Sequence, residues 1–561
     1  MNYHVYLFEM KSIQAYITRT GRLRDLTNLS DLLDSIIDEE NQASVLESVI
    51  TAIDPDKELK FIRRGGGAIH LYSANREKVL RFRSVWTLLF SQLVPGMTYT
   101  DCMTEVRDEK DNLSKDLSDA FIKLNSSINA PSVSLPYATA IVQASSRTGL
   151  ADVLVSGDAN ISKSERDDTD LSTLRTSYPL RYLRKNLYLK FLKGNGGEDK
   201  NEALANSFKN RFDLLINELD NGNSDYASRD IAYVHFDGNS VGKTIIGLRN
   251  NISKYSLSQQ AGILKAFSEV ITKSTTEAVS EALMYIYKDL AFEKDFIFRP
   301  LVLGGDDVTL LIEPRYALPF CQKYCGLFEQ KTKKAIKAFT SDNNVCIGVE
   351  KLTASGGILF NKINHPAINT HQIVEQLAEK AKYLTKHPET PEDISPSAVA
   401  FFRLSTTSSD SLDTIFKRGR VFTVEKNRQI NVGDGCYYID KHKSKTRTDV
   451  ESFIALLEAI RDSQKEKQTS VVSKFRAMLT CIAQGSMYEA DRIYRNLMEK
   501  QHINKNLKER ISVFFGSVNK WYYETGEKKG ESYRSPIADL IVMAHYMDQG
   551  DGACDTQNQP D

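Results

Sequence analysis

The chain has 561 residues, and its 73 lysines and arginines are balanced by 73 aspartates and glutamates. A neutral chain of this length can bury several cores, but it gives no global case for binding nucleic acid or a membrane, so such binding must come from local patches. The seven cysteines lie scattered without paired spacing, which argues against a disulfide framework and a structural zinc site.

The amino-terminal segment is apolar but contains Glu9 and Lys11, and it has no small-residue cleavage site. It is therefore not typical of a signal peptide. No apolar run approaches the length of about 20 residues that spans a bilayer. We expect a cytoplasmic protein that has no membrane partner.

An internal repeat organises the first 440 residues. The stretches 59–73 and 298–313 each predict a tight hairpin with a Gly-Gly turn, whose tip needs residues that tolerate positive φ. A strand that ends in Glu9 precedes the first hairpin, and a strand that ends in Asp237 precedes the second, in both cases with a largely helical segment between. The chain is predicted to hold two copies of one β-α-α-β-β unit. Their predicted limits are 1–130 and 226–440, with a linker or helical insert at 131–225.

The insert contains a polar loop and then a basic, tyrosine-rich helix over 178–193. Arginine and lysine interleaved with tyrosine could track a nucleic-acid strand. An amphipathic helix whose cations reach over apolar ground gives the same pattern, so both interpretations stay open.

The stretch 235–244, HFDGNSVGKT, follows an apolar strand and resembles a phosphate-binding P-loop. A P-loop needs glycine at 237, where this chain has Asp237; Gly238 comes one residue late, and a carboxylate at the mouth would repel phosphates. We interpret Asp237 instead as a metal-binding acid, with Gly238 letting the backbone carbonyl approach the metal. The helix that begins near Ser240 would offer amide donors and Lys243 to a triphosphate.

The second hairpin carries Asp306 and Asp307 where the first has Gly67 and Ala68. Adjacent acids between apolar strands repel one another unless a cation lies beside them, and oxygen ligands of this kind suit Mg²⁺ or Mn²⁺ bridging nucleotide phosphates. A polar turn with capping aspartates is the alternative. The first copy cannot chelate a metal at its hairpin, so we predict a metal site in the second copy only.

A third element, at 351–386, predicts a strand of small residues that a ligand could approach closely, and then an amphipathic helix. Lys382 lies in this helix behind Ala381 and is a candidate phosphate contact, although an ordinary surface lysine is the common alternative. Beyond the polar, basic stretch 440–449 the pattern becomes helical only, which predicts a helical bundle at 445–547. Residues 548–561 are polar and acidic, and we expect disorder there.

These elements, in this order, resemble the large palm-domain subunit of type III CRISPR effector complexes, and more remotely the GGDEF nucleotide cyclases. The resemblance covers nearly the whole chain, and the hairpin LVLGGDDVTLLIE is its most specific motif. It implies an α+β fold with two palm domains of the ferredoxin-like, nucleotide-cyclase type, of which the first is degenerate, and a helical carboxyl-terminal domain. Looser matches lie at 8–33, 353–360, 377–384 and 395–405.

The resemblance also implies an activity and its residues. Palms with Gly-Gly-Asp-Asp bind two divalent ions, Mg²⁺ or Mn²⁺, and two ATP molecules, and they join nucleotides by attack of a 3′-hydroxyl on an α-phosphate with release of pyrophosphate. The product is a cyclic or short oligonucleotide that signals in antiviral defence. Carried onto this chain, the catalytic and metal-binding residues would be Asp237, Gly238, Asp306 and Asp307. The nucleotide-binding residues would be Gly304, Gly305, Lys382, Ser240, Lys243 and Ser355.

Three departures from the family pattern stand out. The chain starts at the first palm and contains no His-Asp dipeptide, so we expect no DNA cleavage by an HD nuclease domain. The region 142–157 has no cysteine where relatives often place a zinc cluster. Asn239 stands where relatives tend to carry a second acid, which leaves the metal shell one charge lighter.

A second hypothesis is a scaffold subunit of an RNA-guided complex, without its own nuclease, whose palm only binds nucleotide. The candidate partners besides ATP are therefore RNA, other effector subunits, or a second copy of the chain. A third hypothesis, a P-loop NTPase, fails on the missing glycine.

Overall fold

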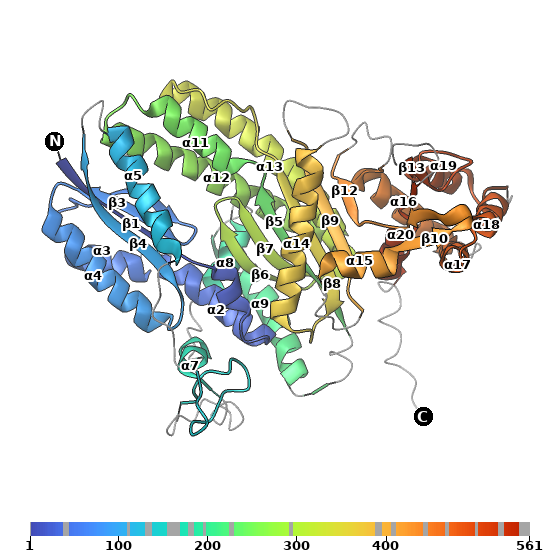
Figure 1. The fold of residues 1–561 in the computed structure, drawn as a ribbon, viewed down its shortest axis with the longest axis horizontal. Coiled ribbons are helices and arrows are strands. Elements are labelled where there is room, and N and C mark those ends of the chain that lie inside the picture. The colour runs from blue at the N-terminus through green and yellow to red at the C-terminus, as the bar shows by residue number, and fades with distance from the viewer. Residues whose placement is uncertain are drawn as a thin grey trace.

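Over the residues that it describes, the computed structural model has three sheets and the helices that cover them (Figure 1). The two palm-like copies and the carboxyl-terminal helices follow one another along the longest axis. The structure describes residues 2–37, 44–108, 113–129, 137–153, 169–177, 184–193, 198–220, 222–223, 229–290, 296–387, 395–405, 411–440, 447–465, 471–499, 503–525 and 532–548.

The first copy is a four-stranded sheet in the order β2-β3-β1-β4, with β1 antiparallel to both of its neighbours. Both faces of β1 are buried because helices cover both sides. On one side Trp86 and Phe90 pack on Phe8, with ring centroids 5.7 and 5.2 Å away. The strands are β1 (Asn2–Met10), β2 (Lys60–Gly65), β3 (Ala68–Ser73) and β4 (Tyr99–Arg107), and the helices are α1 (Ile13–Thr18), α2 (Leu23–Ile37), α3 (Val45–Ile53), α4 (Arg76–Leu93) and α5 (Leu113–Ser126).

The second copy repeats this strand order. Its sheet runs β12-β9-β8-β5-β7-β6, so β6-β7-β5-β8 corresponds to β2-β3-β1-β4. The internal repeat is therefore confirmed and is longer than predicted, because each copy also has a helix after its hairpin, a further strand and a further helix. The elements are β5 (Asp230–Gly238), α11 (Val241–Ile252), α12 (Leu257–Tyr285), β6 (Phe298–Gly304), β7 (Asp307–Ile312), α13 (Pro314–Asn343), β8 (Ala354–Lys362), α14 (Ala367–Lys386), β9 (Ala398–Arg403) and β12 (Cys436–Tyr438).

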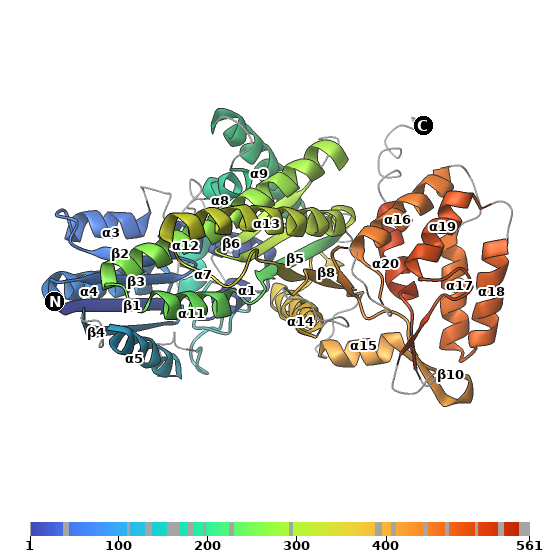
Figure 2. The same ribbon diagram turned by 90° about the horizontal axis from the view of Figure 1, so that it is seen from above.

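Helices α12 and α13 cover one face of the second sheet and α14 covers the other (Figure 2). Alternate residues of β5 point to opposite faces. Phe236 packs on Tyr324 of α13, with centroids 5.4 Å apart, whereas Tyr233 packs toward His371 of α14. Asp237 has the parity of Tyr233, so its side chain lies on the α14 face.

Helix α2 of the first copy packs against β6 of the second. Arg299 forms a buried ion pair with Asp31 at 2.6 Å and donates a hydrogen bond to the Thr27 carbonyl at 3.1 Å. The Ser30 hydroxyl donates to the carbonyl of Leu301. Helix α2 of the first copy therefore fixes the position of β6, the first strand of the hairpin that bears the acids.

The carboxyl-terminal part is helical, as predicted, but the expectation of helices alone is wrong. Strand β14 pairs with β13 and with β11, and β11 and its neighbour β10 precede residue 440, so the order is β10-β11-β14-β13. Three-residue strands carry almost no periodic signal, and β14 gains its partner β11 from about a hundred residues away. The elements are α15 (Leu412–Arg420), β10 (Val421–Val424), β11 (Arg428–Asn431), α16 (Val450–Lys465), α17 (Val471–Ala483), α18 (Met487–Glu499), α19 (Lys505–Phe514), β13 (Tyr523–Thr525), β14 (Ser532–Arg534) and α20 (Ile537–Asp548).

Several predicted segments lie partly outside the described residues. Of the predicted basic helix, the structure describes α8 (Arg184–Leu192); α7 (Leu171–Ser177) and α9 (Glu198–Asp220) flank it. Residues 441–446 of the predicted linker and 549–561 of the predicted tail also lie outside. The domain limits stay a prediction. Among the described helices none is long and apolar enough to cross a membrane.

We expect Asp31→Asn to lower the free energy of unfolding by about 3 kcal/mol, because it leaves the Arg299 charge buried without a counter-ion. The exposed pair Lys505–Glu509 supplies the control, since Lys505→Ala should change stability by less than about 0.5 kcal/mol. Thermal and denaturant unfolding measure both variants. Equal stability of the two would show that the buried pair does not hold the copies together.

Candidate active site

The sheet register brings Asp237 to the hairpin acids. Strand β5 pairs with β7 from Ala232 opposite Ile312 to Phe236 opposite Val308, so Asp237 continues the ladder toward Asp307. The other edge of β5 pairs with β8, where Asp237 lies opposite Ser355. The predicted gathering of the acids at one end of the sheet is what the register produces.

Asp306 occupies the tight turn between β6 and β7. Gly305 has φ +62° there, a conformation that favours glycine. A Cβ at Gly238 would lie 2.7 Å from Oδ2 of Asp306, so a side chain at 238 would displace that carboxylate. A Cβ at Gly304 would lie 3.5 Å from the Cα of Gly66, which places the two diglycine turns in contact. Gly238 thus lets the Asp306 carboxylate lie close to the backbone, and Gly304 lets the two hairpin turns lie close together.

Burial and the neighbouring carboxylates both disfavour the charged form of Asp306. Burial, the charge of Asp237 and a hydrogen bond with Asp237 raise the pKa of Asp306 to about 7, and the charge of Asp307 adds to the effect. A carboxyl with this pKa shares a proton with its neighbours near neutral pH unless cations compensate the cluster.

One cation of the protein already lies in the cluster. Lys382 of α14 forms an ion pair with Oδ2 of Asp237. Both side chains are partly exposed, at 27% and 35%. The sequence predicted Lys382 as a phosphate contact, and that role stays a prediction; in the structure Lys382 is a counter-ion of Asp237.

Two further side chains orient Asp307, and sequence reasoning missed both. Nδ1 of His235 lies 3.3 Å from Oδ1 of Asp307 and 3.0 Å from the hydroxyl oxygen of Thr309. Gln14, from α1 of the first copy, donates to Oδ2 of Asp307 at 3.2 Å. His235 could have been found, because it precedes Asp237 by two residues on a strand and so shares its face. Gln14 left no local signal.

Burial opposes the charge on His235 and by itself lowers the imidazole pKa, but the hydrogen bond with Asp307 and the charges of Asp307 and Asp237 outweigh it. The pKa of His235 is therefore raised. The imidazole is held as a donor toward Asp307.

The remaining predicted residues are divided between the surface and the interior. Ser240 is exposed, has φ +59° and stands before the first residue of α11 without a side-chain cap hydrogen bond. Lys243 is exposed on the first turn of α11. Ser355 is fully buried beside Asp237, and its hydroxyl has no hydrogen-bond partner. Ser240 and Lys243 can meet a solvent-borne ligand, whereas Ser355 can be reached only from within the site.

The oxygen donors of these acids are of the kind that Mg²⁺ or Mn²⁺ prefers. In the parts of the chain that the structure describes, no three acidic, histidine or cysteine side chains are arranged to hold one ion, and Asp237 is turned to Lys382. Mg²⁺ commonly takes one or two carboxylates and fills its other positions with substrate phosphates and water. Burial and then the charges of Asp237 and Asp307 raise the pKa of Asp306, and a cation beside these acids would oppose that rise.

In the first copy the corresponding acid is paired with a buried histidine. Glu9 corresponds in register to Asp237, lies opposite Ala68, and accepts its hydrogen bond from His70 at 3.1 Å. The hydrogen bond with His70 lowers the pKa of Glu9. The expectation that the first hairpin has no acids of its own to bind a metal is consistent with this arrangement.

Comparison with known proteins identifies the second copy. Residues 230–388 match the family model described as Cas10/Cmr2, second palm domain. No match was found among the curated proteins. The matched segment begins with β5 and ends just after α14, so it contains every residue of the acid cluster.

Solved structures resemble the whole described chain more distantly. A Csm1–Csm4 cassette in complex with cA4 is 10% identical, with a TM-score of 0.44, and the match covers 97% of this chain and 70% of that one. A type III-B Cmr-beta in the apo state is 10% identical, with a TM-score of 0.46 and coverage of 98% and 82%. Csm1 in T. onnurineus is 10% identical, with a TM-score of 0.44 and coverage of 97% and 69%.

The stability of the metal-free protein should depend on Asp306. Its folded-state pKa of about 7 lies above the ordinary value of about 3.9, so the folded state binds this proton more tightly. The contribution of Asp306 to stability is full below about pH 4 and is lost as the pH rises to about 7. Thermal unfolding in chelator should show this decline, and Asp306→Asn should flatten it. A decline unchanged in Asp306→Asn, with exposed Asp342→Asn as control, would contradict the assignment.

We expect Gly238→Ala to weaken Mn²⁺ binding by about tenfold or more, because the new methyl group would displace the Asp306 carboxylate and meet Val241 at 2.6 Å. Gly242→Ala is the matched control, since a Cβ there meets nothing within 4 Å. Titration followed by Mn²⁺ electron paramagnetic resonance measures both. Equal affinities in the two variants would show that close packing at Gly238 is not needed for the metal.

Proposed function

From the Cas10/Cmr2-type second palm that residues 230–388 form, we propose that the chain is a nucleotidyltransferase. It joins ATP into a cyclic or short oligonucleotide by attack of a 3′-hydroxyl on an α-phosphate, with release of pyrophosphate, and it acts in antiviral defence as a subunit or relative of type III CRISPR effectors. The single observation that carries the proposal is the acid cluster of Asp237 on β5, Asp307 on the adjacent strand β7, and Asp306 in the turn before β7.

In the proposed reaction Asp237, Asp306 and Asp307 would hold Mg²⁺ or Mn²⁺. Bound divalent ions supply two effects: they lower the pKa of the attacking hydroxyl and neutralise charge on the phosphates. Gln14 and His235 fix the direction of the Asp307 carboxylate by the contacts described above. These contacts come from both copies, so the carboxylate is oriented before substrate arrives.

Three features of the chain are suited to the triphosphate. The left-handed Ser240 leaves the first amides of α11 open to an anion at the helix start, where the dipole favours negative charge. Lys243 lies on the same turn. Lys382 would exchange its pairing with Asp237 for a phosphate oxygen as the acid becomes a metal ligand. The turn at Gly304 and Gly305 carries no side chain between the hairpin and a nucleotide.

We expect the purified chain, given labelled ATP with Mn²⁺ or Mg²⁺, to release pyrophosphate, and the double variant Asp306→Ala/Asp307→Ala to reduce release by about a hundredfold or more. The double variant should stay folded, because removing two acids relieves repulsion. Asp342→Ala, an exposed acid at the end of α13, is the control and should retain activity. Mass spectrometry of the product gives the base, the linkage and the ring size.

The assay should be run with and without added RNA, because the activating ligand is not fixed by the site. Pyrophosphate release that is equal in the double variant and the native chain would contradict the proposal. ATP binding by the native chain without pyrophosphate release under any condition would also contradict it, and would favour the scaffold hypothesis.

A further inference from the structure

The position of Asn239 has a counterpart in the first copy. Glu9 and Asp237 correspond in the strand registers, so Lys11 corresponds to Asn239 and Ser12 to Ser240. Both serines stand before the first residue of the next helix, and both are left-handed, with φ +50° and +59°. Non-glycine residues seldom adopt this conformation. Its occurrence at equivalent positions shows that the two strand-to-helix turns have the same shape.

The same backbone hydrogen bond closes both turns. The amide of Lys11 donates to the carbonyl of Thr98 at 2.8 Å, and the amide of Asn239 donates to the carbonyl of Thr353 at 2.8 Å. Thr98 comes directly before β4, and Thr353 comes directly before β8, which is the equivalent strand.

The same kind of side-chain hydrogen bond also recurs. Nζ of Lys11 donates to the carbonyls of Ser127, at 3.2 Å, and Ile128, just after α5. Nδ2 of Asn239 donates to the carbonyl of Pro396, at 3.3 Å, in the segment that follows α14. It also donates to the Thr353 hydroxyl at 2.9 Å. Helices α5 and α14 follow the equivalent strands, so two different side chains make the same connection.

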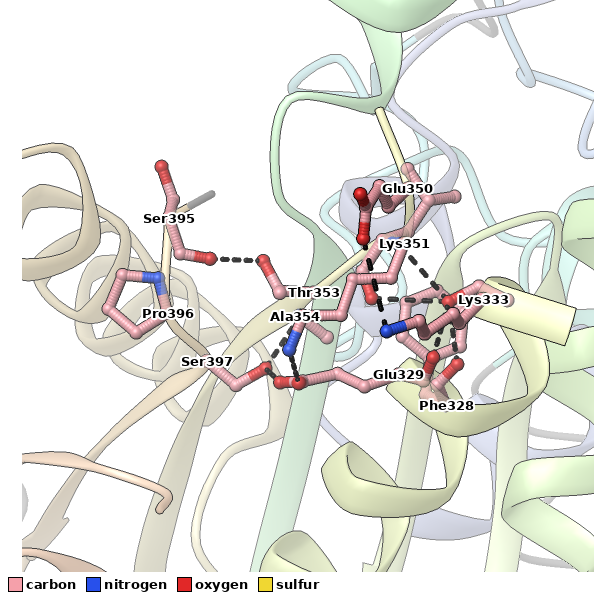
Figure 3. Close-up of polar contacts among 12 residues, drawn as sticks. Phe328, Glu329, Lys333, Glu350, Lys351, Thr353, Ala354, Ser395, Pro396 and Ser397 are labelled. Atoms are coloured by element: carbon pink, nitrogen blue, oxygen red, sulfur yellow. Dashed lines mark hydrogen bonds and ion pairs between the residues drawn. The ribbon is translucent and has the colours of Figure 1, made fainter. Parts of the chain in front are cut away.

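The acceptor segment of the second copy is itself firmly held (Figure 3). The Thr353 hydroxyl donates to the carbonyl of Ser395 at 2.8 Å, and the amide of Ala354 donates to the hydroxyl of Ser397 at 3.1 Å. Ser397 in turn donates to Oε1 of Glu329, on α13, at 2.6 Å. Asn239 therefore bonds to a fixed anchor and not to a free loop.

These contacts require a hydrogen-bond donor at residue 239. An amide and an ammonium both donate to a carbonyl oxygen, whereas an ionised carboxylate has no proton to give. Asn239 is only 9% exposed, so an aspartate there would place its charge against the Pro396 carbonyl with little water to compensate. The physical environment selects a donor and disfavours an acid.

We propose that Asn239 is a positioning residue, a latch that fixes the turn after β5 and with it the carboxylate of Asp237, two residues earlier, for metal and nucleotide. The turn has a hydrogen-bond donor at this position in both copies, Asn239 in the second and Lys11 in the first. Asn239 is therefore not a metal ligand that has lost its charge. That the latch positions a metal-binding carboxylate rests on the proposed function. That the latch exists rests on the matching hydrogen bonds in the two copies.

The test compares Asn239→Asp, Asn239→Ala and Lys11→Met. Lys11→Met breaks the same connection in the copy that lacks the hairpin acids. Both Asn239 variants should weaken Mn²⁺ binding by about tenfold, with aspartate at least as damaging as alanine, because a lost buried hydrogen bond is worth about that factor. Lys11→Met should cost a similar shift in unfolding temperature but leave Mn²⁺ affinity near that of the native chain.

Amide hydrogen exchange of the metal-free variants gives a second measurement. Exchange should become faster across 237–244 and 395–397 in the Asn239 variants, and not there in Lys11→Met. Tighter Mn²⁺ binding by Asn239→Asp would overturn the proposal and identify residue 239 as a metal-ligand position. Native affinity and native exchange in Asn239→Ala would overturn it as well.

Failure of the proposed function is distinguishable from failure of the latch. If the native chain binds Mn²⁺ but releases no pyrophosphate, the transferase proposal fails while the titration and exchange still decide the latch. If the native chain binds no Mn²⁺, the positioning of a metal-binding carboxylate is overturned, and faster exchange in the Asn239 variants would then leave a connection of structural value only.

Discussion

The mutual repulsion of carboxylates held by strand pairing is the constraint on which the second copy depends. Backbone hydrogen bonds between β5 and β7 bring Asp237 to the hairpin acids even though the carboxylates repel one another. The raised pKa of Asp306 and the ion pair of Asp237 with Lys382 are two answers to the same excess of negative charge. The sheet thus holds the acids close together, whereas a flexible loop would let them move apart.

The two copies show how one scaffold can keep its connections while its chemistry changes. Strand order, the left-handed serine and the backbone bond after the first strand are common to both. The differences are concentrated at the hairpin tip and at the acid it faces, where Glu9 is paired with His70. The first copy still takes part in the site, since Gln14 reaches Asp307 and Gly66 lies against Gly304.

Much of this arrangement could be predicted from the sequence, because strands, turns and acids leave local signals. Gly304 to Asp307 and Asp237 were found from apolar runs interrupted by glycine and acid, and the repeat was found from two such hairpins. Contacts that join distant segments left no such trace. The partner of Lys382 and the contact of Gln14 depend on how helices lie across a sheet, which periodicity does not encode. The strands β13 and β14 were missed because their ladder is completed by a distant strand.

The buried pair of Arg299 and Asp31 also limits how the molecule can move. Parting Arg299 from Asp31 and from the Thr27 carbonyl would leave buried charge without its partners, at a cost of several kcal/mol. The pair therefore opposes separation of the two copies where α2 meets β6. On the α14 face of the sheet, Lys382 and Asp237 remain partly exposed, so their side chains can rearrange without any movement of the two copies.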